Sequence, residues 1–471
     1  MRKNINCSIL AGSVPNKLKI AKVIPIFKTG EINKFNNYRP VSILPYFSKY
    51  FEKIMHMRLT NYLASKSTLT NSQYGFRTGH STFMALIEMQ TKITEAIDNN
   101  LFSIGIFFDL SKAFDTVDHK ILIKKLEHYG VRGLGLSWFF DYLQNRKQYV
   151  SFDNHLSEQL NVRCGVPQGS ILGPLLFLIY INDISNSSSS FHFIIFADDT
   201  NAFLSDKSLE TLYTRALNEL ESLSEWFKAN KLSLNLSKTN YIIFRSKNKI
   251  IPVLESSIKI DNKEISQVTT TKFLGVYVDE HLTFNDHVSI IAKKVAKNIG
   301  IISRIRHVLQ RPILMNLYNT LILPYLSYCN IVWASNYHSH LARLTILQKR
   351  IVRIICGLKY NQSTRIYFVK LRIMSLLNIN KMQTGVFMYR FKHRLLPESF
   401  ANNFQLNTDV HCYYTRSYNK YHKVYARTKT RQFSISYRGP CVWNSLPIPL
   451  TIVPTLGTFK MKLKQYLIEL E

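Results

Sequence analysis

Apolar and polar positions follow two different periods along the first 280 residues. Continuous apolar runs at 104–108, 191–195 and 202–204 have the length of buried β-strands. Segments 48–63, 83–97 and 209–227 show helical spacing, and a helix from about 118 to 129 ends before Gly130. In 209–227, apolar residues recur every three or four positions: Leu209, Leu212, Ala216, Leu220, Leu223 and Phe227. The pattern predicts alternating strands and helices, with helix 209–227 packed behind a sheet.

After residue 280 the pattern becomes mainly helical. Residues 286–309 form a predicted amphipathic helix with apolar positions at Val288, Ile291, Val295, Ile299, Ile302 and Ile305. The basic residues of this segment are Lys293, Lys294, Lys297, Arg304 and Arg306. They suit either a duplex backbone or a solvated helix face. Residues 313–400 look helical and basic, and the pattern alone assigns them no fold. The tract 186–190 is predicted to be a hairpin loop.

Charge is distributed very unevenly over the 471 residues. The formal net charge is +31, and residues 281–471 carry 28 Lys and Arg against 5 Asp and Glu. Such one-signed stretches favour a polyanionic partner. In the tail from 413 to 438, cations including Arg416, Lys420 and Lys423 alternate with aromatic rings. This alternation is typical of single-strand nucleic-acid contact, although tyrosines in such a pattern equally suit a core.

Cysteine spacing and hydropathy bear on the compartment. The six cysteines show no metal-ligand spacing, so they are interpreted as free thiols in a reducing, intracellular compartment. The chain opens without an apolar signal core. The charge-free windows 164–182 and 312–342 contain Pro, Gly or Asn interruptions and are interpreted as buried helical core. We therefore expect no membrane partner.

Three carboxylates carry the candidate chemistry. Asp198 and Asp199 lie between apolar strands in FADDT (196–200), and Asp109 ends the strand 104–108. Two carboxylates ~4 Å apart repel by roughly 4 kcal/mol at an effective dielectric near 20. Retaining both in a tight turn therefore indicates a cation, unless the turn is simply solvated. Oxygen ligands suit Mg²⁺, and two such ions can activate a hydroxyl and stabilise a leaving oxygen.

The motifs together resemble the reverse transcriptases of non-LTR retrotransposons (LINE-type, jockey-like). They occur in family order: NYRPVS (37–42), QYGFRTGHST (73–82), FDLSKAFD (108–115), GVPQGSILGP (165–174), FADD (196–199), NKLSLN (230–235) with SKT (237–239), and FLGV (273–276). The resemblance implies an α+β right-hand polymerase with an antiparallel palm sheet, flanking helices and a helical thumb. Fingers are expected at 1–100, palm at 101–280, thumb at 281–375 and a basic, aromatic-rich C-terminal region at 376–471.

The resemblance also implies roles at the metal and nucleotide sites. Asp109 and Asp198 would contact two Mg²⁺ ions, for which Mn²⁺ could substitute, and Asp199 would be more peripheral. Phe114 would lie beneath the incoming sugar and exclude ribonucleotides, unless it is palm core. Gln168 and Gly169 would position the nucleotide. Asp115 is a candidate cap for the following helix.

Further roles concern the phosphates and the primer. Arg77, and more weakly Lys28 or Arg39, would bind the triphosphate, because a guanidinium matches phosphate oxygens. Lys238 would protonate departing pyrophosphate or, alternatively, be a solvated loop lysine. The primer grip is expected at Phe273, Leu274 and Gly275.

The implied activity is RNA-directed DNA polymerisation. A DNA primer 3′-hydroxyl would attack a dNTP opposite an RNA template. The rival hypotheses are a catalytically silent, transposon-derived nucleic-acid-binding relic and an RNA-dependent RNA polymerase, against which Phe114 argues. Because relatives of this class carry an endonuclease ahead of the polymerase and this chain starts near the fingers motifs, integration is expected to need a separate endonuclease.

Overall fold

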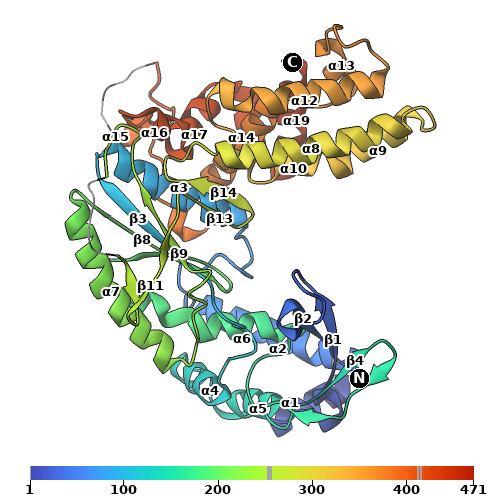
Figure 1. Ribbon diagram of the computed structural model, residues 1–471, viewed down its shortest axis with the longest axis vertical. Coiled ribbons are helices and arrows are strands. Elements are labelled where there is room, and N and C mark those ends of the chain that lie inside the picture. The colour runs from blue at the N-terminus through green and yellow to red at the C-terminus, as the bar shows by residue number, and fades with distance from the viewer. Residues whose placement is uncertain (1, 252–256, 411–412, 414–415) are drawn as a thin grey trace.

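The computed structural model describes residues 2–251, 257–410, 413 and 416–471. Its elements run round an arc, with the N-terminal elements at one end, a central sheet in the middle and a helical body at the other end (Figure 1). This arrangement matches the order fingers, palm and thumb.

The fingers are built on a sheet of order β2-β1-β4-β5, with β6 also paired to β4. The elements here are α1 (Arg2–Ala11), β1 (Ile20–Phe27), β2 (Tyr38–Ile43), α2 (Tyr46–Ser65), β4 (Lys147–Phe152), β5 (His155–Leu156) and β6 (Leu160–Asn161). Strand β4 pairs parallel with β1. Residues 147–161, placed with the palm in the sequence-based division, therefore lie in the fingers sheet. A pairing across more than 100 residues leaves no local sequence signal.

The palm is a five-stranded sheet of order β12-β9-β3-β8-β7 with β3 at its centre. Its strands are β3 (Phe102–Phe108), β7 (His192–Phe196), β8 (Asp199–Asp206), β9 (Asn240–Phe244) and β12 (Ser266–Gln267). Helices α3 (Thr82–Asp98) and α7 (Leu209–Ala229) pack on these strands. Helix α4 (His119–His128) packs on α5 (Gly133–Leu143) and α6 (Leu172–Ile181), which in turn contact α1 and α2 of the fingers. Two small hairpins follow, β10 (Lys259–Ile260) with β11 (Lys263–Glu264) and β13 (Thr270–Phe273) with β14 (Val276–Asp279).

The two faces of the palm sheet are covered by different helices. Ile104, Ile106 and Phe108 of β3 share a core with α7, whereas Phe107 packs in the core that contains α3 and the thumb. On that second face Gly105 has no side chain, and a Cβ there would lie 2.7 Å from the Phe203 ring. Strand alternation thus divides the palm between two cores.

The thumb and the C-terminal region share one hydrophobic core. Their helices are α8 (Asn285–Ile305), α9 (Arg311–Leu321), α10 (Leu323–Ser327), α11 (Asn330–Trp333), α12 (His338–Cys356), α13 (Arg365–Lys370), α14 (Leu376–Lys392), α15 (Asn407–Val410), α16 (Lys429–Phe433), α17 (Ile435–Asn444), α18 (Ile448–Thr451) and α19 (Leu456–Glu469). Long helices α8 and α12 run side by side, and α14 packs against α17 and α19 (Figure 1). The expected division at 375/376 therefore does not separate two cores.

Most of the pattern-based elements are confirmed. All six apolar positions predicted for the 209–227 helix are buried in α7. The tract 186–190 is not a hairpin loop, because it links α6 and a short 3₁₀ turn (Asn182–Ser187) to β7. Across the described residues, no helix combines the length and apolar character needed to span a bilayer. The five described cysteines are Cys7, Cys164, Cys329, Cys356 and Cys441, and all are free thiols; Cys412 lies outside the described residues.

Candidate active site

The Asp198–Asp199 pair lies at the turn of the β7–β8 hairpin. Phe196 pairs with Asp199 across the two strands, so Ala197 and Asp198 form a two-residue turn. Ala197 has φ +57° and is buried. This left-handed conformation costs roughly 1–2 kcal/mol for a residue with a Cβ. Both aspartates remain exposed to solvent at the tip.

Asp109 is brought to the same end of the sheet by the register of β3. This strand pairs antiparallel with β8, and Phe108 lies opposite Thr200. Asp109 follows directly, next to the strand that begins at Asp199. The register therefore brings the three carboxylates to the same end of the palm sheet, and their joint role as a metal site stays a prediction.

Polar neighbours hold Asp109 in place. Asn235 donates through Nδ2 to Asp109 Oδ2 at 3.0 Å, and its backbone N–H donates to the Asp109 carbonyl at 2.8 Å. The Asp109 N–H donates to the Thr239 hydroxyl at 3.3 Å. Lys238 Nζ lies 3.8 Å from Asp109 Oδ2, which places the predicted proton donor beside the carboxylates. Both side chains are largely exposed, so this ion pair contributes little to stability.

The electrostatics of the hairpin are those of crowded negative charge. Desolvation, followed by the negative charges of Asp198 and Asp109, raises the pKa of Asp199 to about 6. Desolvation also raises the pKa of Asp198, helped by Asp109, while the charges of Arg39 and Lys28 act in the opposite direction. The carboxylates are open to solvent on one side, yet protein surrounds them closely enough to weaken their hydration. Both pKa shifts therefore follow from weakened hydration first and from the neighbouring negative charges second.

The donor set fits a hard divalent cation. Within the described ranges no group of three or more His, Cys, Asp or Glu side chains stands close enough to hold a metal ion on its own. Mg²⁺, however, usually takes one or two protein carboxylates and completes its shell with water and phosphate oxygens. Asp109 and Asp198 supply that number of carboxylates from adjacent strands. Their mutual repulsion is the kind of cost that a cation relieves.

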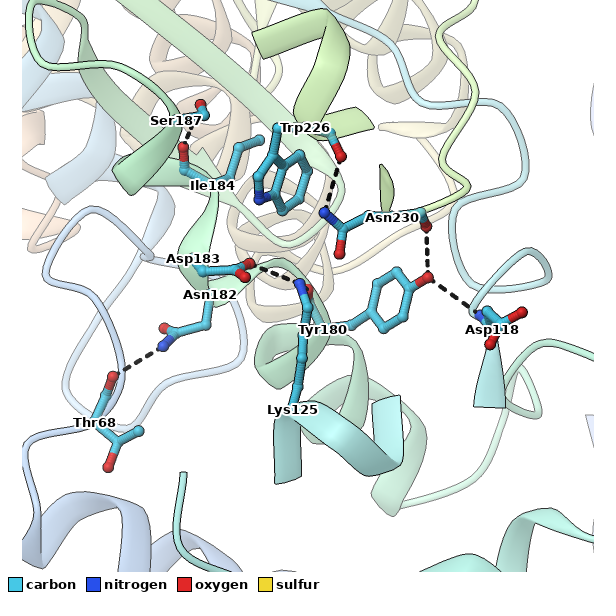
Figure 2. Close-up of polar contacts among 10 residues, drawn as sticks. All are labelled: Thr68, Asp118, Lys125, Tyr180, Asn182, Asp183, Ile184, Ser187, Trp226 and Asn230. Carbon is cyan, nitrogen blue, oxygen red and sulfur yellow. Dashed lines mark hydrogen bonds and ion pairs between the residues drawn. The ribbon is translucent and has the colours of Figure 1, made fainter. Parts of the chain in front are cut away.

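Residues of α6 and of the end of α7 fix the loop between Asp109 and α4. Tyr180 donates to the Asn230 carbonyl at 2.5 Å and accepts from the Asp118 N–H at 3.3 Å, as Figure 2 shows. Asp118 caps α4 by accepting from the N–H groups of Lys120 and Ile121. The prediction that Asp115 caps this helix was therefore wrong. Asp118 is the residue directly before the helix, where a side chain can reach those two groups.

A cavity of ≈ 670 Å³ lies beside this network. Its lining includes Thr68, Lys125, Asn182 and Asp183, and the Lys125–Asp183 ion pair of 2.7 Å is drawn in Figure 2. None of the sequence-predicted site residues lines it. The candidate chemistry therefore belongs to the exposed hairpin and not to this cavity.

The loop of Gln168 and Gly169 packs against the fingers. Gln168 donates through Nε2 to Asp115 Oδ1 at 2.8 Å, and its carbonyl accepts from the Ser42 N–H at 2.7 Å. Gly169 has φ +126°, and a Cβ there would lie 2.4 Å from the Ser42 carbonyl oxygen. Only glycine fits this approach. Asp115 is thus a partner of Gln168.

Phe114 lies at the edge of the palm core. Its ring stacks on the buried Phe177 at 4.6 Å between centroids and meets Phe76 edge-on at 6.5 Å. The side chain is half-buried, so one part packs in the core and another part remains accessible. The two interpretations of Phe114, core residue and sugar gate, are compatible in this position.

The candidate triphosphate ligands differ in how they are engaged. Arg77 Nη1 donates to the carbonyls of Thr70 and Gln73 at 2.6 and 3.2 Å, and burial lowers the pKa of its guanidinium. Its described contacts thus stabilise the fingers loop, and nucleotide binding by Arg77 stays a prediction. Lys28 and Arg39 are exposed, and their charges act on Asp198. Together with Lys238 beside Asp109, they supply positive charge to the carboxylate site.

The expected primer grip is the β13–β14 turn. Leu274 and Gly275 have φ +45° and +83°, as a two-residue hairpin turn requires. Phe273 is buried and packs against Phe107 of β3, 5.9 Å between ring centroids. Tyr328 of the thumb donates to the Leu274 carbonyl at 2.8 Å. The turn is therefore fixed to both palm and thumb.

The predicted nucleic-acid contacts are exposed. Exposed basic side chains on or next to α8 are Lys293, Lys294, Lys297, Arg304 and Arg306, and those of the tail are Arg416, Lys420 and Lys423. The tail tyrosines divide between the two interpretations, because Tyr421 is in the core and Tyr425 is 87 % exposed. Arg427 and Arg431 donate to carbonyls of α3 instead.

Three supporting residues were not singled out by the sequence. Asn235 and Thr239 hold Asp109, and Gln73 accepts from the Ala197 N–H at the hairpin turn. All three lie in motifs that carried the resemblance, at 73–82, 230–235 and 237–239. The motifs indicated that these segments matter, but they do not show which residues of distant segments form hydrogen bonds with one another.

Carboxylates at the tip of an antiparallel palm sheet, between fingers and a helical thumb, define a right-hand polymerase. Residues 26–278 match the family described as reverse transcriptase (RNA-dependent DNA polymerase). Since the match covers more than half of the chain, the chain belongs to the reverse transcriptase family.

Relatives agree with the non-LTR retrotransposon resemblance. The chain is 30% identical over 358 residues to the probable RNA-directed DNA polymerase from transposon X-element of Drosophila melanogaster, covering 74% of this chain and 38% of the relative. It is 28% identical over 408 residues to the RNA-directed DNA polymerase from mobile element jockey of the same species, covering 84% and 44%. The chain spans less than half the length of these relatives. An apo telomerase structure from Candida tropicalis aligns with TM-score 0.44 and 11% identity, over 81% of this chain and 66% of that one.

Proposed function

We propose that this chain is an RNA-directed DNA polymerase that extends a primer 3′-hydroxyl with dNTPs on an RNA template. The observation that carries the proposal is the register that places Asp109 beside the Asp198–Asp199 turn, within a chain of the reverse transcriptase family. The X-element and jockey relatives are named RNA-directed DNA polymerases, which supports the same activity.

The carboxylates would hold the divalent cations. Asp109 and Asp198 are the direct ligands in this proposal, and Asp199 is peripheral. Two bound Mg²⁺ ions, or Mn²⁺ in their place, would supply activation of the primer hydroxyl and stabilisation of charge on the leaving pyrophosphate. Lys238 would give a proton to that leaving group, which its closeness to Asp109 supports.

Other residues orient the nucleotide. Lys28 and Arg39 would neutralise triphosphate oxygens, because both are exposed and their charges act on Asp198. Gln168 and Gly169 would position the base and sugar, and the accessible part of Phe114 would collide with a 2′-hydroxyl. The turn at Leu274 and Gly275 would position the primer end.

The basic helices and tail would hold the template and primer. The exposed cations of α8 suit a duplex backbone, and those of the tail suit a single strand. An intracellular location belongs to this proposal as well.

Primer extension on poly(rA)/oligo(dT) with dTTP and Mg²⁺ tests it. The wild type should extend, and Asp198→Asn should not. Asp206→Asn, at the other end of the same β8 strand, is the matched control and should extend normally. If folded protein binds template-primer with a steep salt dependence but never extends it, the silent binding relic is the correct description. Preference for rNTPs over dNTPs would instead support an RNA polymerase.

A further inference from the structure

The fingers motif at residues 72–75 lies against the catalytic hairpin as if it were an additional strand. The Tyr74 N–H donates to the Ile195 carbonyl at 2.7 Å, and the Ile195 N–H donates to the Ser72 carbonyl at 2.9 Å. Gln73 and Ile195 form an isolated parallel bridge. A Cβ on Gly75 would lie 2.3 Å from the Ala197 nitrogen, so the two backbones touch at the turn.

The Gln73 side chain bonds the turn itself. It is 2 % exposed, and its Oε1 accepts from the Gly75 N–H at 2.7 Å and from the Ala197 N–H at 3.0 Å. Its Nε2 is buried without a hydrogen-bond partner among the described residues. The side chain therefore accepts from two backbone groups and, in the part of the chain that the structure describes, donates to none.

The geometry makes this acceptor important for Asp198. Ala197 holds φ +57°, which a residue with a Cβ adopts only when its surroundings compensate for the strain. The bond to Gln73 is formed by the residue directly before the catalytic carboxylate. Without that bond, the Ala197 N–H is buried and unpaired, and the turn is free to relax toward an unstrained conformation.

We propose that Gln73 is a positioning residue for the catalytic hairpin: it fixes the Ala197 turn and thereby the direction of the Asp198 and Asp199 carboxylates. It touches neither substrate nor metal and acts through the backbone. The proposal rests on the polymerase function proposed above. It assigns the QYG part of the fingers motif to the geometry of the palm carboxylates.

A second buried glutamine provides a matched control. Gln90 of α3 is also 2 % exposed, and its Nε2 donates to the Val332 carbonyl of α11 at 3.0 Å while its Oε1 has no partner among the described residues. Its substitution thus removes one buried hydrogen bond, in the core between α3 and the thumb. A purely structural role for Gln73 predicts that the two glutamines behave alike.

The experiment compares Gln73→Met, Gln73→Glu and Gln90→Met in steady-state primer extension, with urea unfolding and template-primer affinity measured on the same proteins. A displacement of about 1 Å in a catalytic group can cost about 100-fold in rate. We expect Gln73→Met to lower kcat by about 10- to 100-fold while the KM for dTTP and the template-primer affinity stay within about twofold. Gln73→Glu keeps an acceptor oxygen at the same place but adds a buried charge near Asp198 and Asp199, so its kcat should lie between those of Gln73→Met and the wild type.

Gln90→Met should change the urea midpoint but leave kcat within about twofold, since it touches no catalytic group. Equal kcat values for the folded Gln73→Met and Gln90→Met proteins would overturn the proposal. If Gln73→Met does not fold, Gln73→Asn is measured in its place, because its shorter side chain moves the acceptor oxygen away from the Ala197 N–H. A wild-type kcat for Gln73→Asn would equally overturn the proposal. Absence of extension by the wild type would instead contradict the polymerase function.

Discussion

The palm hairpin and the helical thumb use charge in opposite ways. At the hairpin, three carboxylates share one end of a sheet, and the pKa of Asp199 rises to about 6 because desolvation and the other two carboxylates oppose its ionisation. From residue 281 onward, 28 basic residues face only 5 acidic ones, and those of α8 are exposed and spread along the helix. The palm concentrates unfavourable charge at one point, whereas the thumb distributes favourable charge over a surface.

This difference teaches where single residues matter. Asp109 is held by Asn235, which donates to its carboxylate, and by the Thr239 hydroxyl, which accepts from its backbone N–H. Gln73 accepts from the Ala197 N–H in the turn that carries Asp198. Among the described residues, no neighbouring side chain duplicates these carboxylates. A thumb lysine is one of several equivalent cations whose effects on a polyanion add. Single substitutions should therefore abolish function in the palm and only weaken it in the thumb.

The largest effect is expected from Asp109→Asn, which tests whether one palm carboxylate is indispensable. The isosteric amide keeps volume but removes the charge that would hold a cation, so kcat should fall by about 10³-fold or more. Combining it with Asp198→Asn should add little, since residues that act as a unit are not additive. Single-turnover primer extension measures both values. A multiplicative effect in the double variant would contradict a shared site.

The next largest effect is expected from a triple change on α8, Lys293→Gln with Lys294→Gln and Lys297→Gln. Removing one lysine–phosphate interaction lowers the slope of log affinity against log salt by about 1. We expect a slope reduced by about 2 to 3 and an affinity lower by about 10- to 100-fold near 0.1 M salt. Fluorescence anisotropy with a labelled RNA–DNA duplex provides the measurement.

A matched triple separates contact from net charge. Lys460, Lys462 and Lys464 of α19 are also exposed. Their replacement by Gln removes the same total charge and should change affinity by less than about threefold. Equal reductions in affinity from the two triples would show that α8 acts only through the overall field.

Phe114→Ala tests a palm residue that packs in the core and, in the proposal, also discriminates dNTPs from rNTPs. Removal of the ring should raise rGTP and rUTP use relative to dNTPs by about 10-fold, a difference of about 1.4 kcal/mol in transition-state binding. The measurement is the ratio of kcat/KM values. Phe76→Ala removes only the exposed edge-on partner and should leave the ratio within about twofold. A ratio unchanged in Phe114→Ala would assign Phe114 to the core alone.

Local patterns predicted most elements of the fold and much of the site. Helical spacing located α7 and α8, and apolar runs located β3, β7 and β8, because each signal lies within one segment. The carboxylates were recognisable because a charged pair between apolar strands is costly. The parallel pairing of β4 with β1, the shared core of thumb and C-terminal region, and the Gln73–Ala197 bond depend on segments far apart in sequence. The local hydrophobic period of one segment carries no information about such long-range contacts. The sequence also did not show where the loop before α4 ends, and for that reason Asp115 and not Asp118 was considered as the helix cap.

The smallest effect at neutral pH concerns His287, which is buried at the start of α8 between palm and thumb. Its ring is 3 % exposed, Nδ1 accepts from the Tyr277 N–H at 3.3 Å, and the ring lies 5.3 Å from that of Trp333. Burial, assisted by the charge of Lys294, lowers the pKa of His287 to about 4 from 6.5. The folded state thus binds fewer protons than the unfolded state between these values.

Stability must therefore fall as the pH decreases from about 6.5 to about 4, by at most about 3 kcal/mol from this group, and be unaffected above that range. His287→Gln cannot titrate, so the difference in urea midpoint between the wild type and this variant should change across that interval in favour of the variant. Parallel midpoints from pH 7 to pH 4 would contradict the assignment. A pH-dependent difference would show that the two regions also treat protonation differently. The hairpin keeps its carboxylates together despite their mutual repulsion. The thumb excludes the positive charge of a protonated His287 from its core and carries its cations at the surface.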